Sequence, residues 1–248
     1  MKLSFFFAFL LFNFAQSQNL KVEYSRLNNR DIDYSNSEIS SDDFKNKISK
    51  ELEKGQKNIL YILNGNSFFK SIPRGSIITE EEGNRVDNRT TTRNRNEFID
   101  TQMKIYNKKG DKGFYQYHNF DDDEMYHYSI PKFDNIEYKE DVEYIENYKC
   151  KLAEVSVMGN INKIWYTEDI PVSAGPYVFN NLPGLVLKIE NSNFIIYATK
   201  VSNEGKKEDF ENINPKLKVL NDEEFMKRRS EYQTEKSKVK EDRKTIRL

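Results

Sequence analysis

The chain has few of the residues on which most metal and nucleophilic chemistry depends. Its 248 residues include one cysteine, two histidines and one tryptophan. The single cysteine, Cys150, has no partner within the chain for a disulfide. One cysteine and two histidines also match no structural zinc pattern, which takes four ligands. The sequence therefore predicts neither a disulfide scaffold nor a metal centre, and no cofactor.

An excess of either charge is also missing. The 39 Lys and Arg residues face 40 Asp and Glu residues, and the two signs are interspersed along the chain. Because a nucleic-acid footprint needs a basic face, we expect no nucleic-acid partner. The mean hydropathy is low, at −0.84, but 17 Phe and 15 Tyr residues supply the apolar area that disordered chains lack.

Long apolar runs are absent except for a short one at the N-terminus. Lys2, the run over residues 5–12 and the small-residue site Ala15-Gln16-Ser17 predict a secretory signal peptide over residues 1–17, cut before Gln18. The run is shorter than the roughly 20 residues of a spanning helix. We therefore expect an exported protein, periplasmic or secreted, that does not span a membrane.

Residues 18–220 are expected to form a single domain that is mainly β with minor α. The predicted fold is a curved antiparallel sheet, a meander like half of a barrel. Apolar alternation predicts strands over residues 20–27, 59–63, 68–72, 103–106, 114–120, 125–130, 135–138 and 144–158.

Two helical segments are expected beside the sheet. Apolar residues every fourth position, with Gly55 just past the end, predict an N-terminal helix from Ser41. Residues 221–248 are nearly all charged after Gln233, which predicts a short helix that frays into a solvated tail. Residues 73–96 lack apolar periodicity, and their four arginines are read as a solvated loop and not as a phosphate site.

Residues 164–201 form the most apolar long segment after the N-terminus, and they predict two hairpins. A turn at Asn191-Ser192 would pair Ile189 with Phe194 and place one face of the hairpin on the core. A turn at Gly159-Asn160 would pair Val155 with Ile164, leaving Trp165 on the opposite face.

Several motifs in this region resemble the GLPGLI family of secreted envelope proteins. The resemblance is carried by Cys150-Lys151-Leu152-Ala153, Trp165-Tyr166-Thr167, Asp169-Ile170-Pro171-Val172, Gly175-Pro176-Tyr177 and Asn181-Leu182-Pro183-Gly184-Leu185-Val186. The last run departs from the family name at its first and last positions. The resemblance implies export to a Gram-negative envelope, and the family has no established biochemical function.

Candidate catalytic groups are weighed against plain structural roles. Cys150 lies on a strand beside Leu152, where a lone cysteine is usually a small buried hydrophobe. His118 and His127 flank an acidic run that reads as an exposed turn and has no known metal-ligand spacing. Neighbouring carboxylates point to opposite faces of a strand. We therefore expect no catalytic residues, with an enzyme using Cys150 or a carboxylate as the alternative.

The expected function is that of a non-enzymatic envelope protein with a groove for an apolar ligand, such as an envelope lipid, or for a partner protein. A structural interaction module of an outer-membrane complex is a further alternative. The connection over residues 175–185 carries apolar side chains, and Trp165 leads into it. Its Gly and Pro residues are equally explained by a purely structural crossing between strands, which is the alternative to a binding role. The candidate ligand or partner site comprises Trp165, Tyr177, Phe179, Leu182, Pro183, Gly184 and Leu185.

Overall fold

The computed structural model describes residues 19–28, 50, 53–82, 93–157 and 159–245. Its main feature is a twelve-stranded sheet with the order β14-β8-β7-β6-β3-β2-β1-β13-β12-β11-β10-β9. The strands are β1 (Leu20–Asn28), β2 (Gln56–Leu63), β3 (Asn66–Ser71), β6 (Lys104–Asn107), β7 (Phe114–Phe120), β8 (Asp123–Ser129), β9 (Asn135–Ile145), β10 (Tyr148–Val157), β11 (Asn160–Thr167), β12 (Leu185–Glu190), β13 (Phe194–Ser202) and β14 (Lys218–Leu220).

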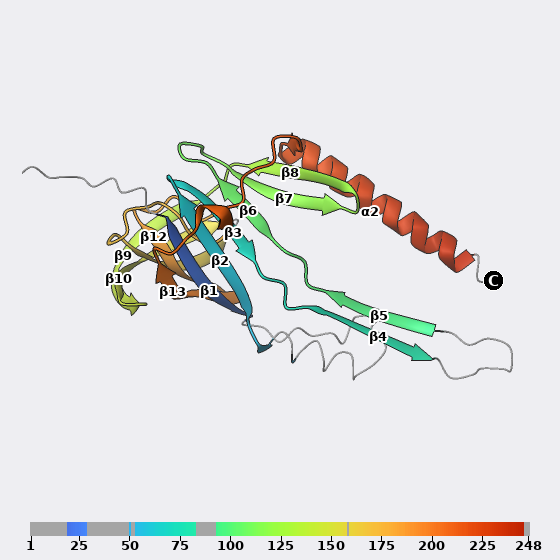
Figure 1. Cartoon of the computed structure of the whole chain (residues 1–248), viewed down its shortest axis with the longest axis horizontal. Helices are drawn as coiled ribbons and strands as arrows, with labels where there is room; N and C mark the ends of the chain where they lie inside the picture. Colours follow the sequence, from blue (N-terminus) through green and yellow to red (C-terminus); the bar gives the residue numbers. More distant parts are fainter. Residues whose placement is uncertain (1–18, 29–49, 51–52, 83–92, 158, 246–248) are drawn as a thin grey trace, which may run out of the picture.

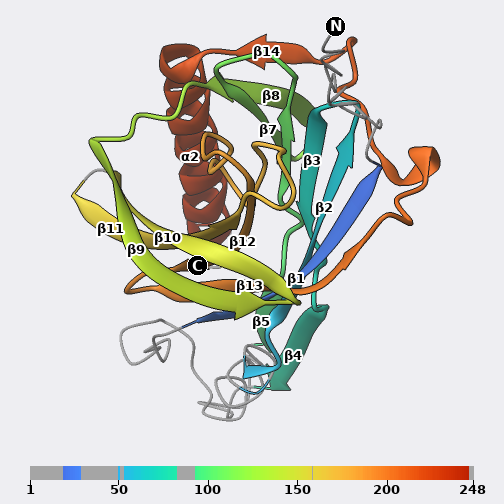
Figure 2. The same ribbon diagram turned by 90° about the vertical axis from the view of Figure 1, so that its left-hand side faces the viewer.

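The sheet consists of two antiparallel meanders. One consists of β1, β2, β3, β6, β7 and β8, the other of β9 to β13, and pairing of β1 with β13 joins them. Only β14 is parallel to its neighbour, β8. The chain passes from β8 to β9 through residues 130–134, which can span about 20 Å at most. Because β8 and β9 lie near opposite ends of the strand order, this short link requires the sheet to curl, as Figure 2 shows. The mainly β, curved antiparallel fold is confirmed.

The core follows from strict alternation on the strands. Leu60 and Ile62 of β2 face the interior of the curl, whereas Tyr61 between them packs in a smaller aromatic cluster on the outer face. The same division separates Phe69 from Phe68 on β3. The connection over residues 168–184 lies inside the curl (Figure 2) and completes the interior cluster. The strands whose inward residues join this cluster are thus apolar on one face.

Both predicted hairpins form, but each turn is displaced by one residue. Ile189 pairs with Ile196 and not with Phe194, and Ile164 pairs with Ala153 and not with Val155. Moving a turn by one residue changes the pairing by two, which leaves every side chain on its expected face. Ile164 and Ile196 are accordingly fully buried.

The prediction of a loop over residues 73–96 is wrong for residues 76–82 and 93–96, which form strands. Strands β4 (Ser76–Glu82) and β5 (Arg93–Ile99) pair with each other as a separate two-stranded sheet, which extends away from the curled sheet (Figure 1). Because this ribbon is not part of the large sheet, its sequence need not alternate between core and solvent, and periodicity gave no signal.

The C-terminal helix is longer than expected. Helix α2 (Asp222–Thr245) runs for 24 residues after the short 3₁₀ turn η1 (Lys207–Asp209) and strand β14. Asn221 and Glu224 cap it reciprocally: the Asn221 side chain accepts from the Glu224 amide and the Glu224 carboxylate from the Asn221 amide, both at 3.0 Å. Phe225 anchors the first turn on the sheet, so the helix needs no long apolar stripe.

Two other expectations concern the N-terminal half. The helix expected from Ser41 lies almost wholly outside the described residues, and the signal peptide lies entirely outside them. Among the described residues, no helix is both long and apolar enough to cross a membrane.

Candidate functional site

The connection over residues 168–184 is held inside the curl by its own polar bonds and by packing. Phe179 and Leu182 are buried in the interior cluster. The Ser173 hydroxyl lies 2.6 Å from the Asn180 carbonyl and 2.7 Å from the Leu182 carbonyl, so it can donate to either. The Asn180 amide donates to Asn107 of β6 at 2.8 Å. The connection is thus a fixed plug and not a free loop.

Tyr177 is the strained residue of this plug. Its φ is +57°, in the left-handed region that non-glycine residues rarely adopt. The surroundings maintain this conformation: the Tyr177 ring packs edge-on against Phe69 at 5.1 Å and against Phe194 at 5.5 Å. Burial raises the pKa of Tyr177 to about 12 despite nearby Arg26, so the phenol keeps its proton near neutral pH.

Tyr177 and Phe179 line a pocket of about 500 Å³ at one end of the curl. The pocket differs from the apolar interior because most of its other residues are polar. They are Arg26, Gln56, Asn58, Ser71, Asn160, Asn162, Asn191 and Asn193, with Met103, Val157 and Phe194.

The polar lining follows from the inward positions near the ends of the strands. On β2 the inward residues run from Ile62 through Leu60 to Asn58, which is 1% exposed. On β11 they run from Ile164 to Asn162, which is 6% exposed. The interior therefore changes from apolar to amide-lined at one end, and this end forms the pocket.

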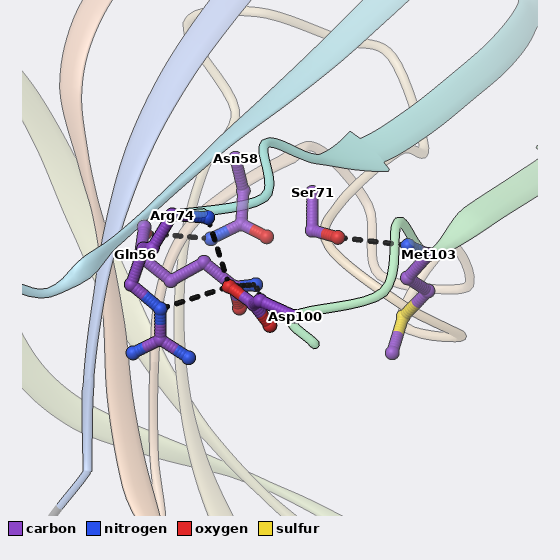
Figure 3. A network of polar contacts seen from close by, with 6 residues as sticks. All are labelled: Gln56, Asn58, Ser71, Arg74, Asp100 and Met103. Atoms are coloured by element: carbon purple, nitrogen blue, oxygen red, sulfur yellow. Dashed lines mark hydrogen bonds and ion pairs between the residues drawn. The ribbon is translucent and has the colours of Figure 1, made fainter. Parts of the chain in front are cut away.

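The amides are partly fixed by bonds within the walls. Asn58 donates to the Gln56 carbonyl at 2.9 Å, and Asn191 donates to the Asn162 side-chain oxygen at 2.9 Å. The Ser71 hydroxyl accepts from the Met103 amide at 2.8 Å (Figure 3). A fixed wall of donors and acceptors can recognise a ligand with several hydroxyl or amide groups.

An ion pair supports this wall from behind. The Asp100 carboxylate accepts from the Arg74 side chain at 2.9 Å and from the Arg74 amide at 3.0 Å. It also accepts from the Gln56 side chain (Figure 3). Burial alone would raise the pKa of Asp100, but the hydrogen bonds from Arg74 and Gln56 and the Arg74 charge lower it on balance. Asp100 is therefore ionised near neutral pH and holds Gln56 in the pocket wall.

The sequence-predicted site residues are divided between the pocket and the core. Tyr177 and Phe179 line the pocket, whereas Leu182 and Leu185 are buried in the interior cluster. Pro183 and Gly184 lie between those two leucines, at the end of the plug. Trp165 is half-buried on β11, with the Lys188 ammonium 5.5 Å from the centre of its ring, and it is not among the residues lining the pocket. The grouping of all seven residues as one site stays a prediction.

Sequence reasoning missed the amides and Arg26. A signal was present, since Arg26, Asn58 and Asn162 each lie two residues from a core residue of the same strand, at inward-facing positions where apolar side chains are expected. A polar residue at such a position marks either a satisfied core group or the wall of a site.

The alternative chemical groups lie elsewhere. Cys150 is buried as predicted, and burial raises the pKa of its thiol to about 11, which disfavours the reactive thiolate. His118 and His127 lie on the paired strands β7 and β8, with the acidic residues at their turn as expected. No cluster of three or more His, Cys, Asp or Glu suited to a metal occurs among the described residues.

Comparison with known proteins decides the family. The family described as "N-glycanase peptide, N-terminal domain" matches residues 74–245, well over half of the chain. The chain belongs to this family. The assignment to the GLPGLI family, drawn from the resemblance of its motifs, is therefore wrong. Its hallmark residues have a packing explanation instead, because a β-carbon on Gly184 would overlap the Thr167 carbonyl and one on Gly175 would crowd Val186.

Solved structures share the fold with this N-glycanase N-terminal domain. The structure of PNGF-II in the P21 space group aligns with a TM-score of 0.53 and 14% identity, over 85% of this chain. In the C2 space group the values are 0.49, 13% and 82%. The chain spans about a third of the length of those PNGF-II chains. A search of curated proteins gives no match.

Proposed function

We propose that this chain is an exported, non-catalytic glycan-binding domain whose ligand enters the pocket beside Tyr177. The name of its family links it to N-glycanases, which act on glycans attached to proteins. The observation that carries the proposal is the lining of the pocket, where aromatic rings stand beside an amide-rich wall. A sugar ring presents hydroxyl groups at its edge and C–H groups on its face, and this lining offers a partner to both.

The lining also distinguishes between the ligand classes. A wholly apolar ligand would displace water from the exposed Asn193 amide of the wall without offering it a hydrogen bond, and covering a polar group without a partner is costly. Of the described residues lining this pocket, none is Asp, Glu, His or Cys, and burial raises the pKa of its tyrosine, Tyr177, to about 12, far from the pH at which general acid–base catalysis works best. Both points support binding of a polar ligand over an apolar one and over catalysis at this place.

The proposal is tested by titrating the purified chain calorimetrically with oligosaccharides released from N-glycosylated proteins. We expect saturable binding that Tyr177→Ala weakens about tenfold or more, as for an aromatic anchor. Tyr177→Phe keeps the ring and should retain most of the affinity. Asn193→Ala removes an exposed amide of the pocket without disturbing the core, and it should weaken binding as well.

Asn203→Ala is the matched control, since Asn203 is exposed and is not among the lining residues of the pocket. Thermal melting confirms that each variant is folded. If no oligosaccharide binds, or if Asn193→Ala and Asn203→Ala bind equally well, the pocket is not a glycan site.

A further inference from the structure

A second cavity lies between helix α2 and the sheet and adjoins the glycan pocket at Val157 and Val178. Its volume is about 730 Å³, within the range typical of small-molecule sites. The apolar part of its wall is contributed by β7, by the crossing between β8 and β9 and by α2. These residues are Phe114, Phe120, Ile130, Phe133, Phe225 and Met226. Ile130 and Met226 are 50% and 60% exposed, which is unusual for large apolar side chains beside a cavity.

The charged side chains of this cavity are mainly cationic. Lys132 and Arg229 both line it and are exposed, and among the described residues no ion pair involves either of them. The carboxylate in the wall, Asp222, is bound by His127 at 2.7 Å and by Ser129, and the Lys132 charge also acts on it without forming an ion pair. The rim therefore offers two cations to an incoming anion.

His118 adds an unused hydrogen-bonding group. Its ring lines the cavity and packs 4.4 Å from the ring of Phe225. Its Nε2 atom is buried and has no hydrogen-bond partner among the described residues. Burial, with smaller effects of His127 and Arg229, lowers the pKa of His118 to about 4, so the ring is neutral near pH 7. An unpaired buried nitrogen costs stability unless something binds it.

We propose that this cavity binds a small carboxylic acid with an apolar chain, such as a medium-length fatty acid. The chain lies among the phenylalanines, and the carboxylate lies at Arg229 and Lys132, which line the same cavity as the neutral His118 ring. A cationic or neutral amphiphile of the same length would meet the same apolar walls and would gain nothing from the two cations. The site adjoins the glycan pocket, since both are lined by Val157 and the Phe133 ring of this cavity lies 6.1 Å from the Phe179 ring of that pocket.

The test compares octanoate, 1-octanol and octylammonium, which share one chain and differ in the charge of the head group. Binding is followed by calorimetry and by the NMR signals of the His118 ring and the Met226 methyl group. We expect saturable octanoate binding that shifts both signals, with 1-octanol at least about fivefold weaker and octylammonium weaker still. Equal binding of octanoate and 1-octanol, or no shift at His118 and Met226, would overturn the proposal.

Two variants with a matched control locate the site. Arg229→Gln should weaken octanoate binding about threefold to fivefold, as expected for a partly exposed cation. Lys227→Gln removes a nearby exposed cation that is not among the lining residues, and it should leave the affinity unchanged. Met226→Asp places a carboxylate at the cavity and should abolish binding while the melting temperature stays near that of the wild type. Equal affinities of the Arg229 and Lys227 variants would contradict the proposed carboxylate position.

Discussion

Gly184 shows how one residue fixes the plug inside the curl. Its backbone passes so close to Thr167 that a β-carbon would overlap the Thr167 carbonyl, which is backbone and cannot rotate away. We predict that Gly184→Ala lowers the free energy of unfolding by about 3 kcal/mol, because the two chain segments must separate. Urea unfolding measures this change.

Gly110→Ala is the comparison for that variant. Gly110 has a φ of +81° and nothing near its missing β-carbon, so only the backbone conformation is penalised, by about 1 kcal/mol. Equal losses at the two glycines would show that the close approach to Thr167 has no special cost.

Cys150 is a residue whose chemistry is set by its surroundings. The side chain is fully buried, and the pKa of the thiol is raised to about 11 by that burial. We predict that a thiol reagent at pH 7 to 8 leaves the native protein unmodified and labels it at once in denaturant. Rapid labelling of the native protein would revive the alternative in which Cys150 acts as a nucleophile.

At the scale of elements, the pair of Arg74 and Asp100 joins the segment after β3 to the segment after β5, beside Gln56 at the start of β2. Because the folded-state pKa of Asp100 is lowered, its stabilising effect is present above the unfolded pKa of about 4 and is lost as the pH falls through the folded value. Asp100→Asn should therefore destabilise the protein by about 2 kcal/mol at pH 7.

The measurement is urea unfolding of wild type and Asp100→Asn at several pH values. The difference between the two should shrink steadily below about pH 4. Asp122→Asn, in the exposed turn between β7 and β8, serves as a control with little effect at any pH. A difference at Asp100 that does not depend on pH would mean that shape, and not charge, makes the contribution.

At the scale of the whole molecule, the signal peptide predicts where the mature chain begins. Lys2, the apolar run and Ala15-Gln16-Ser17 predict cleavage before Gln18, which is two residues ahead of β1. Mass spectrometry of the protein from its native source should find an N-terminus at Gln18 or next to it. A protein that retains Met1 inside the cell would contradict export, and with it the proposed access to secreted or envelope glycans.

Several features of the molecule are determined by the sequence alone. The positions of most strands of the large sheet, their faces and the Asn64-Gly65 turn between β2 and β3 depend on neighbours in the chain. They follow from the two-residue period and from the need for positive φ, which both turn residues have. Burial of Cys150 follows from the same alternation. The two predicted hairpin turns were each displaced by one residue, because several adjacent residues could serve as the turn.

Only the tertiary structure decided how these strands form a site. The pairing of β1 with β13 joins residues about 170 positions apart, and no local period encodes such a contact. The curl that follows from it gathers Arg26, Asn58 and Asn162 around the strained Tyr177. Trp165 lies elsewhere, because it is on the opposite face of β11 from Ile164 and Asn162 and the plug packs against the inward face. A pocket depends on distances between strands, and the sequence specifies those distances only through the complete fold.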